Sequence, residues 1–191
     1  MNKTRIGYAL TGSFCTFSQT MEQLRQLAAQ EWDIFPIMSF NAYNTDTRFG
    51  KAADFIEEME QLSGKTVIHT IDQAEPIGPQ KLLDVLVVAP CTGNTLGKLA
   101  NGITDTPVTL AVKSHLRNGR PVVLAVSTND ALSNSAKNIG ALMNNRNIYF
   151  VPMGQDSCNG KPTSVVADFS QLIPAVRSAL EGRQIQPILR V

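Results

Sequence analysis

The sequence has few of the residues from which metal sites and disulfide frameworks are built. Its 191 residues include only two histidines and three cysteines. Cys15, Cys91 and Cys158 are odd in number, and no two of them have the Cys-x-x-Cys spacing of a zinc or redox motif. Cysteine usage of this kind is typical of a reducing compartment. It argues against a disulfide-stapled secreted fold and against a structural zinc site.

The chain also lacks an excess of charge and a long apolar run. It carries 17 lysines and arginines against 16 aspartates and glutamates, and no cluster of basic residues. Proteins that bind nucleic acid usually present a basic stripe, so we expect no nucleic-acid partner. No apolar run reaches the roughly 18 residues of a membrane span, and the polar opening MNKTR is unlike a secretory leader. We therefore expect a cytoplasmic protein whose partners are small molecules or proteins.

What the chain does have is the composition of a folded protein. Hydrophobic residues make up 43% and charged residues 17% of the sequence, which is typical of globular chains. A chain of this length can bury a full core within one domain. We expect residues 1–191 to form a single domain, in which residues 181–191 are a C-terminal tail.

The most informative stretch is Leu83–Gly102. An apolar run at Val85–Ala89 is followed by small polar residues over Cys91–Thr95, after which apolar residues recur with helical spacing. This order predicts a buried strand, a polar turn and a helix. Ligands of an open α/β sheet bind beyond the carboxyl ends of the strands, so the turn is a candidate ligand site. The alternative is a structural cap, in which Thr92 or Asn94 accepts hydrogen bonds from the helix N-terminus.

Strand and helix patterns alternate along the rest of the chain. Strands are predicted at residues 5–10, 33–39, 66–68, 121–126 and 149–151, helices at about 17–28, 49–62, 107–116, 135–143 and 169–180, and polar loops at 41–48 and 153–164. This alternation predicts a parallel sheet covered by helices on both faces. Pro36 has no N–H for a sheet ladder, which indicates an edge strand, a bulge or a strand entry.

Four turns follow predicted strands at their carboxyl ends and share one chemistry. They contain hydroxyls, amides and backbone N–H groups, and they lie at Thr11–Phe14, Ser39–Phe40, Cys91–Thr95 and Ser127–Asn129. The carboxyl ends of parallel strands share one edge of a sheet, so we expect these turns to meet. Neutral groups of this kind bind a polar ring or a phosphate but supply no acid or base. The pattern therefore indicates binding more than catalysis.

Residues that could perform catalysis are sparse. A nucleophilic Cys91 would need a neighbouring base, and the sequence places neither His69 nor His115 beside it; a lone histidine in an amphipathic helix is more often structural. Asp84 precedes the central strand and Asp105 follows its helix, so the two carboxylates are not expected to converge. Asp105 is interpreted as the cap of the next helix.

Two lysines and the two histidines are the remaining candidates for ligand contact. Lys98 and Lys113 are the charges expected nearest to an anionic ligand if they face the cleft, and solvated lysines are the alternative. Neither histidine has a second ligand at helical or hairpin spacing, so we expect no metal site.

Two longer motifs carry a family resemblance. APCTGNTLGKLANGITDTP resembles the PASANT motif and the following K-x-A-N-G-x-x-D of the flavoprotein family that contains the homo-oligomeric flavin-containing cysteine decarboxylases. STNDALSNSAKNIGALM resembles the P-x-M-N-x-x-M-W segment of that family, and the TGSF turn also matches. The stretches GPQKLLDVLVVAPCTGNTLGKLANGITDTP and NIYFVPMGQD are more similar still to one branch of the family from spore-forming bacteria. The match covers nearly the full chain.

The family resemblance implies a fold and a cofactor. The fold is Rossmann-like and flavodoxin-type, a three-layer αβα arrangement with a mostly parallel, doubly wound sheet. Trimers are common in the family, which implies a homotrimer or larger assembly, and FMN lies near subunit interfaces against the turns described above. The cofactor-binding residues implied are Gly12, Ser13, Phe14, Ser39, Thr92, Gly93, Asn94, Thr95, Ser127, Thr128 and Asn129.

The branch from spore-forming bacteria implies a component of a two-part oxidoreductase. Its members take part in oxidising dihydrodipicolinate to dipicolinate, the aromatic dicarboxylate stored in spores. They act with a separate A subunit that carries a nicotinamide-binding domain. Removal of a hydride and a proton from a dihydropyridine ring needs a cofactor as acceptor. The resemblance thus implies an FMN site on this chain, NAD(P) on the partner chain, and activity only with that partner. This chain would either present the flavin as electron acceptor or help the A subunit to hold the substrate.

Several residues depart from the decarboxylase pattern. Pro76 stands where the decarboxylases carry an active-site histidine, Ser127 and Thr128 replace their Pro-x-Met, and Cys91 and Gly93 alter the PASANT segment. These departures argue against cysteine decarboxylation. The open alternatives to an oxidoreductase component are a cofactor-free scaffold of the same fold that binds a partner, and an FMN-dependent decarboxylase or flavin prenyltransferase.

Overall fold

A computed structural model describes residues 3–30 and 32–190 of the chain. Seven strands form one sheet in the order β2-β1-β3-β4-β7-β6, and β5 also pairs with β4. The strands are β1 (Thr4–Leu10), β2 (Trp32–Met38), β3 (Val85–Cys91), β4 (Val122–Thr128), β5 (Ile148–Phe150), β6 (Met153–Ser157) and β7 (Lys161–Ala167).

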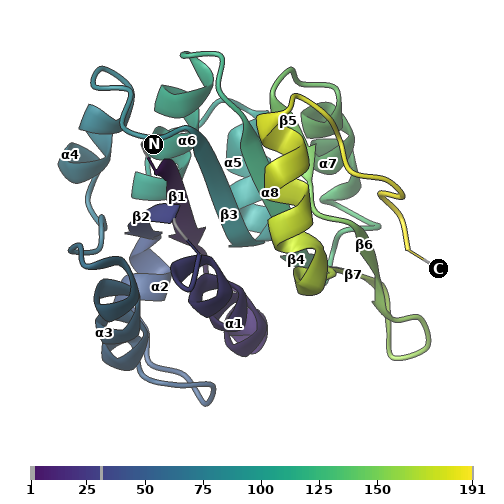
Figure 1. The fold of residues 1–191 in the computed structure, drawn as a ribbon. Coiled ribbons are helices and arrows are strands. Elements are labelled where there is room, and N and C mark those ends of the chain that lie inside the picture. The colour runs from purple at the N-terminus through teal and green to yellow at the C-terminus, as the bar shows by residue number, and fades with distance from the viewer. Residues whose placement is uncertain (1–2, 31, 191) are drawn as a thin grey trace.

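Helices cover both faces of this sheet (Figure 1). Helices α1, α3 and α8 pack on one face, and α4, α5, α6 and α7 pack on the other. The helices are α1 (Phe17–Ala28), α2 (Phe40–Asn44), α3 (Ala52–Ser63), α4 (Ile71–Ala74), α5 (Gly93–Ala100), α6 (Pro107–Leu116), α7 (Ala136–Met143) and α8 (Leu172–Leu180). None of the described helices has the length and apolar character needed to cross a bilayer.

The core consists of two apolar layers separated by the sheet. Along β3 the side chains of Val85, Val87 and Ala89 join the layer beneath α1 and α8, whereas Leu86 and Val88 join the layer beneath α5, α6 and α7. A strand buried on both faces needs an apolar residue at every position, which is why β3 has no polar alternation. The continuous apolar run of the sequence is the direct signature of this central strand.

The strand order places a switch point between β1 and β3. Strands β2-β1-β3-β4-β5 pair in parallel, in the order of a flavodoxin-type doubly wound sheet. The predicted three-layer αβα fold with a mostly parallel sheet is therefore confirmed. The strand β2 ends the sheet, as the edge-strand interpretation of Pro36 predicted. Ligands of such sheets bind beyond the carboxyl ends of the strands where the winding direction reverses.

The prediction of a polar loop at residues 153–164 was wrong. This segment forms β6 and the start of β7, which pair in antiparallel orientation. The strand β7 also pairs with Ser127 and Thr128, so β4 continues beyond its predicted end at Val126. Residues around Asp156 are exposed and carry no alternating apolar pattern. The strand pairing here comes from backbone hydrogen bonds, which leave no signal in the sequence.

Two shorter segments also differ from the prediction. Thr66–Ile68 is not a strand, since it makes only one isolated bridge, between Ile68 and Ile37 of β2. The predicted loop at 41–48 overlaps helix α2, whose N-cap is Ser39. Both segments are too short for a periodic pattern to decide their structure.

The predicted C-terminal tail lies against the sheet. Residues 181–190 run back from α8 past β5 and β6 (Figure 1). The side-chain amide of Gln184 accepts a hydrogen bond from the Phe150 N–H at 2.8 Å and donates one to the Phe150 carbonyl at 2.7 Å. Met153 exchanges two backbone hydrogen bonds of 2.9 Å with residues 188–190. These bonds hold the segment in the manner of an added strand.

Candidate functional site

The structure brings the predicted site residues to one edge of the sheet. Gly12, Ser13 and Phe14 follow β1, Ser39 follows β2, Thr92–Thr95 follow β3, and residues 127–129 end β4. They line three neighbouring hollows at the carboxyl ends of the strands.

The first hollow, which we call the switch cavity, has a volume of about 570 Å³. It lies beyond the carboxyl ends of β1, β3 and β4, at the edge that contains the switch point of the sheet. Its wall combines seven of the predicted residues with Cys15, which precedes α1, and with side chains from the α2–α3 loop and the β6–β7 hairpin. The lining residues are Gly12, Ser13, Phe14, Cys15, Arg48, Phe49, Thr92, Ser127, Thr128, Asn129, Asp156, Lys161, Ser164 and Val166.

A second hollow of about 370 Å³ shares Gly12 and Thr92 with the switch cavity. Its other lining residues are Thr11, Ser39, Phe40, Asn41, Asn94, Thr95, Lys98 and Thr106. A third hollow of about 440 Å³, between α5 and the β4–α7 loop, includes Gly93 and again Asn94. Every predicted site residue therefore lines one of these hollows, and the shared residues make the three contiguous.

Hydroxyl groups join the three central strands beneath the switch cavity. The Ser13 and Ser127 Oγ atoms lie 2.7 Å apart, which links the β1 turn to β4. The Thr11 hydroxyl donates to the Pro90 carbonyl at 2.7 Å and accepts from the Thr92 N–H at 3.1 Å, which links β1 to β3. The floor of the cavity is thus a set of neutral polar groups already held in place by each other.

The capping interpretation holds for Thr92 but not for Asn94. Thr92 is the N-cap of α5, and its hydroxyl accepts a hydrogen bond from the Thr95 N–H at 3.2 Å. Asn94 is exposed and lies in the first turn of the helix. Since Thr92 also lines two of the hollows, its capping role and a ligand-binding role are compatible. Asn94 is available to the two hollows that it lines.

Gly93 allows two turns to pack closely. A Cβ atom at this position would lie 2.7 Å from the Asp130 carboxylate and the Thr128 hydroxyl, and 2.9 Å from the Ser135 hydroxyl. Real Cβ atoms do not approach other atoms this closely, so a larger residue at this position would have to displace these side-chain oxygens of the β4–α7 loop and its neighbours. Gly93 therefore positions the helix α5 against this loop and does not line the switch cavity.

The charged groups of the switch cavity were not predicted. Arg48 comes from the α2–α3 loop, and Asp156 and Lys161 come from the β6–β7 hairpin. Lys161 Nζ lies 2.7 Å from Asp156 Oδ2, and this hydrogen bond raises the pKa of Lys161. The sequence marked both segments as polar loops, which is the only signal it carried. Neither loop could be assigned to the cavity before the strand order was known.

The candidate nucleophile and bases are engaged elsewhere. Cys91 ends β3 inside the core, and burial raises the pKa of its thiol. The His115 Nε2 atom lies 3.1 Å from the Pro121 carbonyl oxygen, and burial lowers the pKa of this histidine to about 4. The His69 ring stacks on Tyr43 with 3.8 Å between ring centroids. In the described part of the chain, no three histidine, cysteine or carboxylate side chains gather as a metal site requires.

The prediction that Asp105 caps the helix α6 was wrong. Thr106 is the N-cap, and its hydroxyl accepts from the Thr109 N–H at 3.2 Å. Asp105 instead accepts a hydrogen bond of 2.7 Å from Lys98, which lowers the pKa of Asp105. A threonine adjacent to the aspartate has the same capping chemistry, so the sequence alone could not choose between them.

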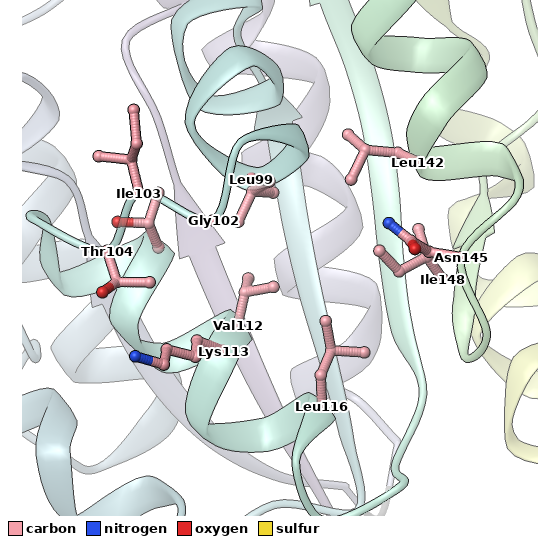
Figure 2. A pocket seen from close by; sticks show the side chains of 11 residues that line it. Leu99, Gly102, Ile103, Thr104, Val112, Lys113, Leu116, Leu142, Asn145 and Ile148 are labelled. Atoms are coloured by element: carbon pink, nitrogen blue, oxygen red, sulfur yellow. The ribbon is translucent and has the colours of Figure 1, made fainter.

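A separate apolar hollow lies among α5, α6 and α7. It has a volume of about 240 Å³ (Figure 2). Leu99, Val112, Leu116 and Leu142 line it, and the ammonium group of Lys113 points away from Leu142 (Figure 2). Lys113 lies here, whereas none of the residues of the four predicted turns does. Of the two lysines proposed near an anionic ligand, Lys98 therefore faces the carboxyl edge of the sheet and Lys113 does not.

Comparison with known proteins identifies the family of this chain. The model of the family described as Flavoprotein matches residues 1–178. The chain belongs to the Flavoprotein family. This family assignment comes from the sequence, so it is independent of the geometry of the switch cavity.

Two relatives are similar along almost the whole chain. The B subunit of dipicolinate synthase from Bacillus subtilis (strain 168) is 45% identical over 185 residues, which cover 97% of this chain and 92% of that protein. The crystal structure of the B subunit of dipicolinate synthase from Bacillus halodurans superposes with a TM-score of 0.90 at 40% identity, covering 100% of this chain and 99% of that chain. The resemblance to the branch indicated by the sequence motifs is confirmed.

A more distant likeness shows the fold. The crystal structure of an FMN-dependent cysteine decarboxylase from thioviridamide biosynthesis superposes with a TM-score of 0.63 at 19% identity, covering 94% of this chain and 99% of that chain. At this identity the superposition describes the arrangement of strands and helices, and function has to be argued from the site.

Proposed function

We propose that this chain is the B subunit of a dipicolinate synthase and that it acts with a separate A subunit to oxidise dihydrodipicolinate to dipicolinate during sporulation. The observation that carries the proposal is the 45% identity to the Bacillus subtilis protein over 97% of the chain. The switch cavity supports it, because a polar hollow at the switch point is where a doubly wound sheet binds its ligand.

The residues of the switch cavity fit FMN in size and in hydrogen-bonding chemistry. A volume of about 570 Å³ lies within the range of roughly 300–1,000 Å³ found for ligand pockets. Hydroxyls of Ser13 and Ser127 and the N-terminus of α5 offer neutral donors and the positive end of a helix dipole. A Cβ atom at Gly12 would lie no closer than 3.5 Å to Phe14, so nothing in the fold requires glycine there. Because Gly12 has no side chain, a ligand can approach the backbone closely at this position.

The roles of the residues follow from this placement. FMN, when bound, supplies a hydride acceptor for a dihydropyridine ring. Ser13, Thr92 and residues 127–129 would orient it through hydroxyl, amide and backbone groups, while Ser39, Asn94 and Thr95 extend the same surface into the second hollow. Phe14 and Phe49 supply aromatic walls that exclude water from a planar ring.

The partner and the assembly belong to the same proposal. We propose that NAD(P) is held by the A subunit, and that the chain is active only in complex with this partner. The charged groups lining the switch cavity are Arg48, Asp156 and Lys161, and the last two pair with each other. This leaves the cavity better suited to holding a cofactor and substrate than to independent catalysis. A homotrimer or larger assembly in the cytoplasm completes the proposal.

Reconstitution of the two-component reaction tests the proposed function. Dihydrodipicolinate oxidation is measured with each of the two proteins separately and with both together, and we expect turnover only with both. The absorption spectrum of the purified complex is expected to show the yellow absorbance of flavin. Full activity from the partner protein without this chain would overturn the proposal. A colourless chain that cannot take up FMN but is still required would favour the cofactor-free scaffold.

A substitution at Gly12 tests the cofactor site directly. Gly12→Val places a branched side chain in the space shared by the first two hollows, and we expect it to abolish FMN uptake with little change in melting temperature. Gly140→Val is the matched control, because a Cβ atom at Gly140 meets nothing within 4 Å and the residue lies outside these hollows. Unchanged FMN uptake by Gly12→Val would contradict the placement of the cofactor.

A further inference from the structure

The charges around the switch cavity are unevenly paired. The two charged residues of the β6–β7 hairpin, Lys161 and Asp156, satisfy each other at 2.7 Å. Across residues 3–30 and 32–190, the ion pairs join other partners, and no carboxylate lies within 4 Å of the Arg48 guanidinium. The cavity therefore has one positive charge whose counterion is not supplied by the described residues.

Arg48 is held at the wall of the cavity by its neighbour. Its guanidinium carbon lies 4.8 Å from the centroid of the Phe49 ring, and both residues line the cavity. An aromatic face attracts a cation that lies over it, and this contact holds the guanidinium at the cavity wall. The planar N–H donors of a guanidinium match the two oxygens of a carboxylate, and this pairing is among the strongest polar contacts in proteins.

Topology separates Arg48 from the hairpin. The α2–α3 loop follows β2 at one end of the sheet, whereas Lys161 begins β7 on the far side of β4. Between these walls lies the neutral floor formed by Ser13 and Ser127. A planar ring bound between these walls would present one side to Arg48 and the other to the hairpin. The arrangement suits a ligand with an anionic group on the side that faces Arg48.

We propose that Arg48 is a substrate-positioning residue, which binds one carboxylate of a planar ring dicarboxylate in the switch cavity and thereby selects dicarboxylates over monocarboxylates. This inference rests on the proposed function, because it takes its substrate class from the oxidation of dihydrodipicolinate. It goes beyond that function in assigning the carboxylate to one residue. The position of Arg48 next to the aromatic walls of Phe14 and Phe49 places the charge beside the ring that it orients.

A comparison of two ligands isolates the interaction. Dipicolinate has two carboxylates on its pyridine ring and picolinate has one, so the ratio of their dissociation constants measures what the second carboxylate contributes. Binding is measured by calorimetry on the complex of this chain with its proposed partner, the A subunit. We expect the wild-type complex to favour dipicolinate about tenfold or more, as a charge-assisted hydrogen bond implies. In Arg48→Gln the ratio falls toward one, while picolinate binding changes little.

Conservative and distant substitutions provide the controls. Arg48→Lys keeps the charge but loses the planar pair of donors, so it should restore part of the ratio. Arg146→Gln removes the same charge from an exposed residue in the α7–β5 connection, and we expect the wild-type ratio. Arg48 is itself exposed, so its variants should melt at the wild-type temperature. In turnover, Arg48→Gln should raise KM for dihydrodipicolinate more than it lowers kcat.

The outcomes separate this inference from the proposed function. An unchanged ligand ratio in Arg48→Gln overturns the inference, even if the complex oxidises dihydrodipicolinate. A wild-type complex that binds both ligands equally overturns it as well. Loss of FMN retention in Arg48→Gln with an unchanged ratio assigns the arginine to the cofactor phosphate and overturns it. If the ratio falls in a complex that does not oxidise dihydrodipicolinate, the carboxylate site stands and the proposed reaction does not.

Discussion

The two edges of the parallel sheet are built from different chemistry. At the amino edge, Asp84 precedes β3 and bridges two arginines: its carboxylate lies 2.7 Å from Arg5 Nη2 and 3.2 Å from Arg120 Nη1. The hydrogen bond from Arg5 is the main cause that lowers the pKa of Asp84. At the carboxyl edge, the central contact is the 2.7 Å hydroxyl pair of Ser13 and Ser127.

This difference separates groups that stabilise from groups that bind. At the amino edge Asp84 is matched by its two arginines, and the edge holds the starts of β1, β3 and β4 together. At the carboxyl edge the hydroxyls join strands but keep spare donors and acceptors, and no carboxylate within the described residues neutralises Arg48. Substitutions at the two edges should therefore affect stability and ligand binding in different proportions.

The largest effect is expected where the carboxyl edge is most tightly packed. Gly93→Val would place side-chain atoms against Asp130, Thr128 and Ser135, whose oxygens already lie under 3 Å from a Cβ at this position. We expect a loss of about 3 kcal/mol in the free energy of unfolding, at the upper end of the range for overpacking. Urea unfolding followed by circular dichroism measures it.

A second glycine of the same helix is the control for this substitution. A Cβ atom at Gly97 meets only the Asn138 amide, at an ordinary 3.5 Å. Gly97→Ala should leave stability unchanged or raise it by up to about 1 kcal/mol, because alanine favours the helix. Equal losses in Gly93→Val and Gly97→Ala would show that the helix, and not the contact between turns, is sensitive.

The pH dependence of stability should come from the amino edge. His115 lies near the end of α6 and contacts the Pro121 carbonyl just before β4, and burial lowers its pKa to about 4. The unfolded histidine titrates near 6.5, so the unfolded state takes up a proton first as the pH falls. The stabilisation is complete above pH 6.5 and declines toward pH 4. We expect a loss of about 2 kcal/mol between pH 7 and pH 5.

Urea unfolding at several pH values between 5 and 7 tests the role of His115. His115→Gln places an amide N–H near the position of Nε2, where it can donate to the Pro121 carbonyl, and it does not titrate in this range, so the slope should flatten. A slope that persists unchanged in His115→Gln would show that another group gives rise to it.

A smaller effect is expected from the ion pairs of the amino edge. Asp84→Asn removes the charge that Arg5 and Arg120 share, and we expect a loss of about 1 kcal/mol at pH 7, since both ion pairs are partly exposed. The pKa of Asp84 is lowered in the folded state, so its contribution is complete above about pH 4 and disappears as the pH falls through the folded pKa. The difference between wild type and variant should therefore shrink in acid.

Asp105 is the control for Asp84, because it is a carboxylate in an ion pair at the carboxyl edge of the sheet. Asp105 pairs with Lys98 at 2.7 Å but is exposed, and Asp105→Asn should leave the free energy of unfolding nearly unchanged at every pH. Thermal unfolding of both variants at pH 7 and pH 3 makes the comparison. Equal effects of Asp84→Asn and Asp105→Asn would remove the distinction between the two edges.

The parts of the fold that were predicted are those with a local physical signature. The buried strands β3 and β4 need apolar residues on both faces, so continuous runs such as Val85–Ala89 revealed them. The polar turns after these strands followed from the rule that ligands of an α/β sheet bind at its carboxyl edge. Thr92 carried the signature of an N-cap and proved to be one.

The parts that were missed depend on contacts between distant segments. The hairpin of β6 and β7 is held by backbone pairing with Ser127 and Thr128, and backbone pairing leaves no pattern in exposed side chains. Arg48 reaches the switch cavity only because β2 lies beside β1, and Lys161 only because β7 lies beside β4. Half of the cavity wall could therefore not be assigned until the strand order was known.

The smallest change in stability should accompany a clear change in binding at Asn94. This residue is exposed in the first turn of α5, lines two hollows of the carboxyl edge and does not cap the helix. Asn94→Ala should shift the free energy of unfolding by less than about 0.5 kcal/mol, as for other surface substitutions. It should weaken FMN binding, measured by fluorescence titration of the purified chain. Thr92→Ala is the contrasting variant, because it also removes the cap and should cost about 1 kcal/mol. A large loss of stability with unaltered FMN binding in Asn94→Ala would make this side chain part of the structure and not of the site.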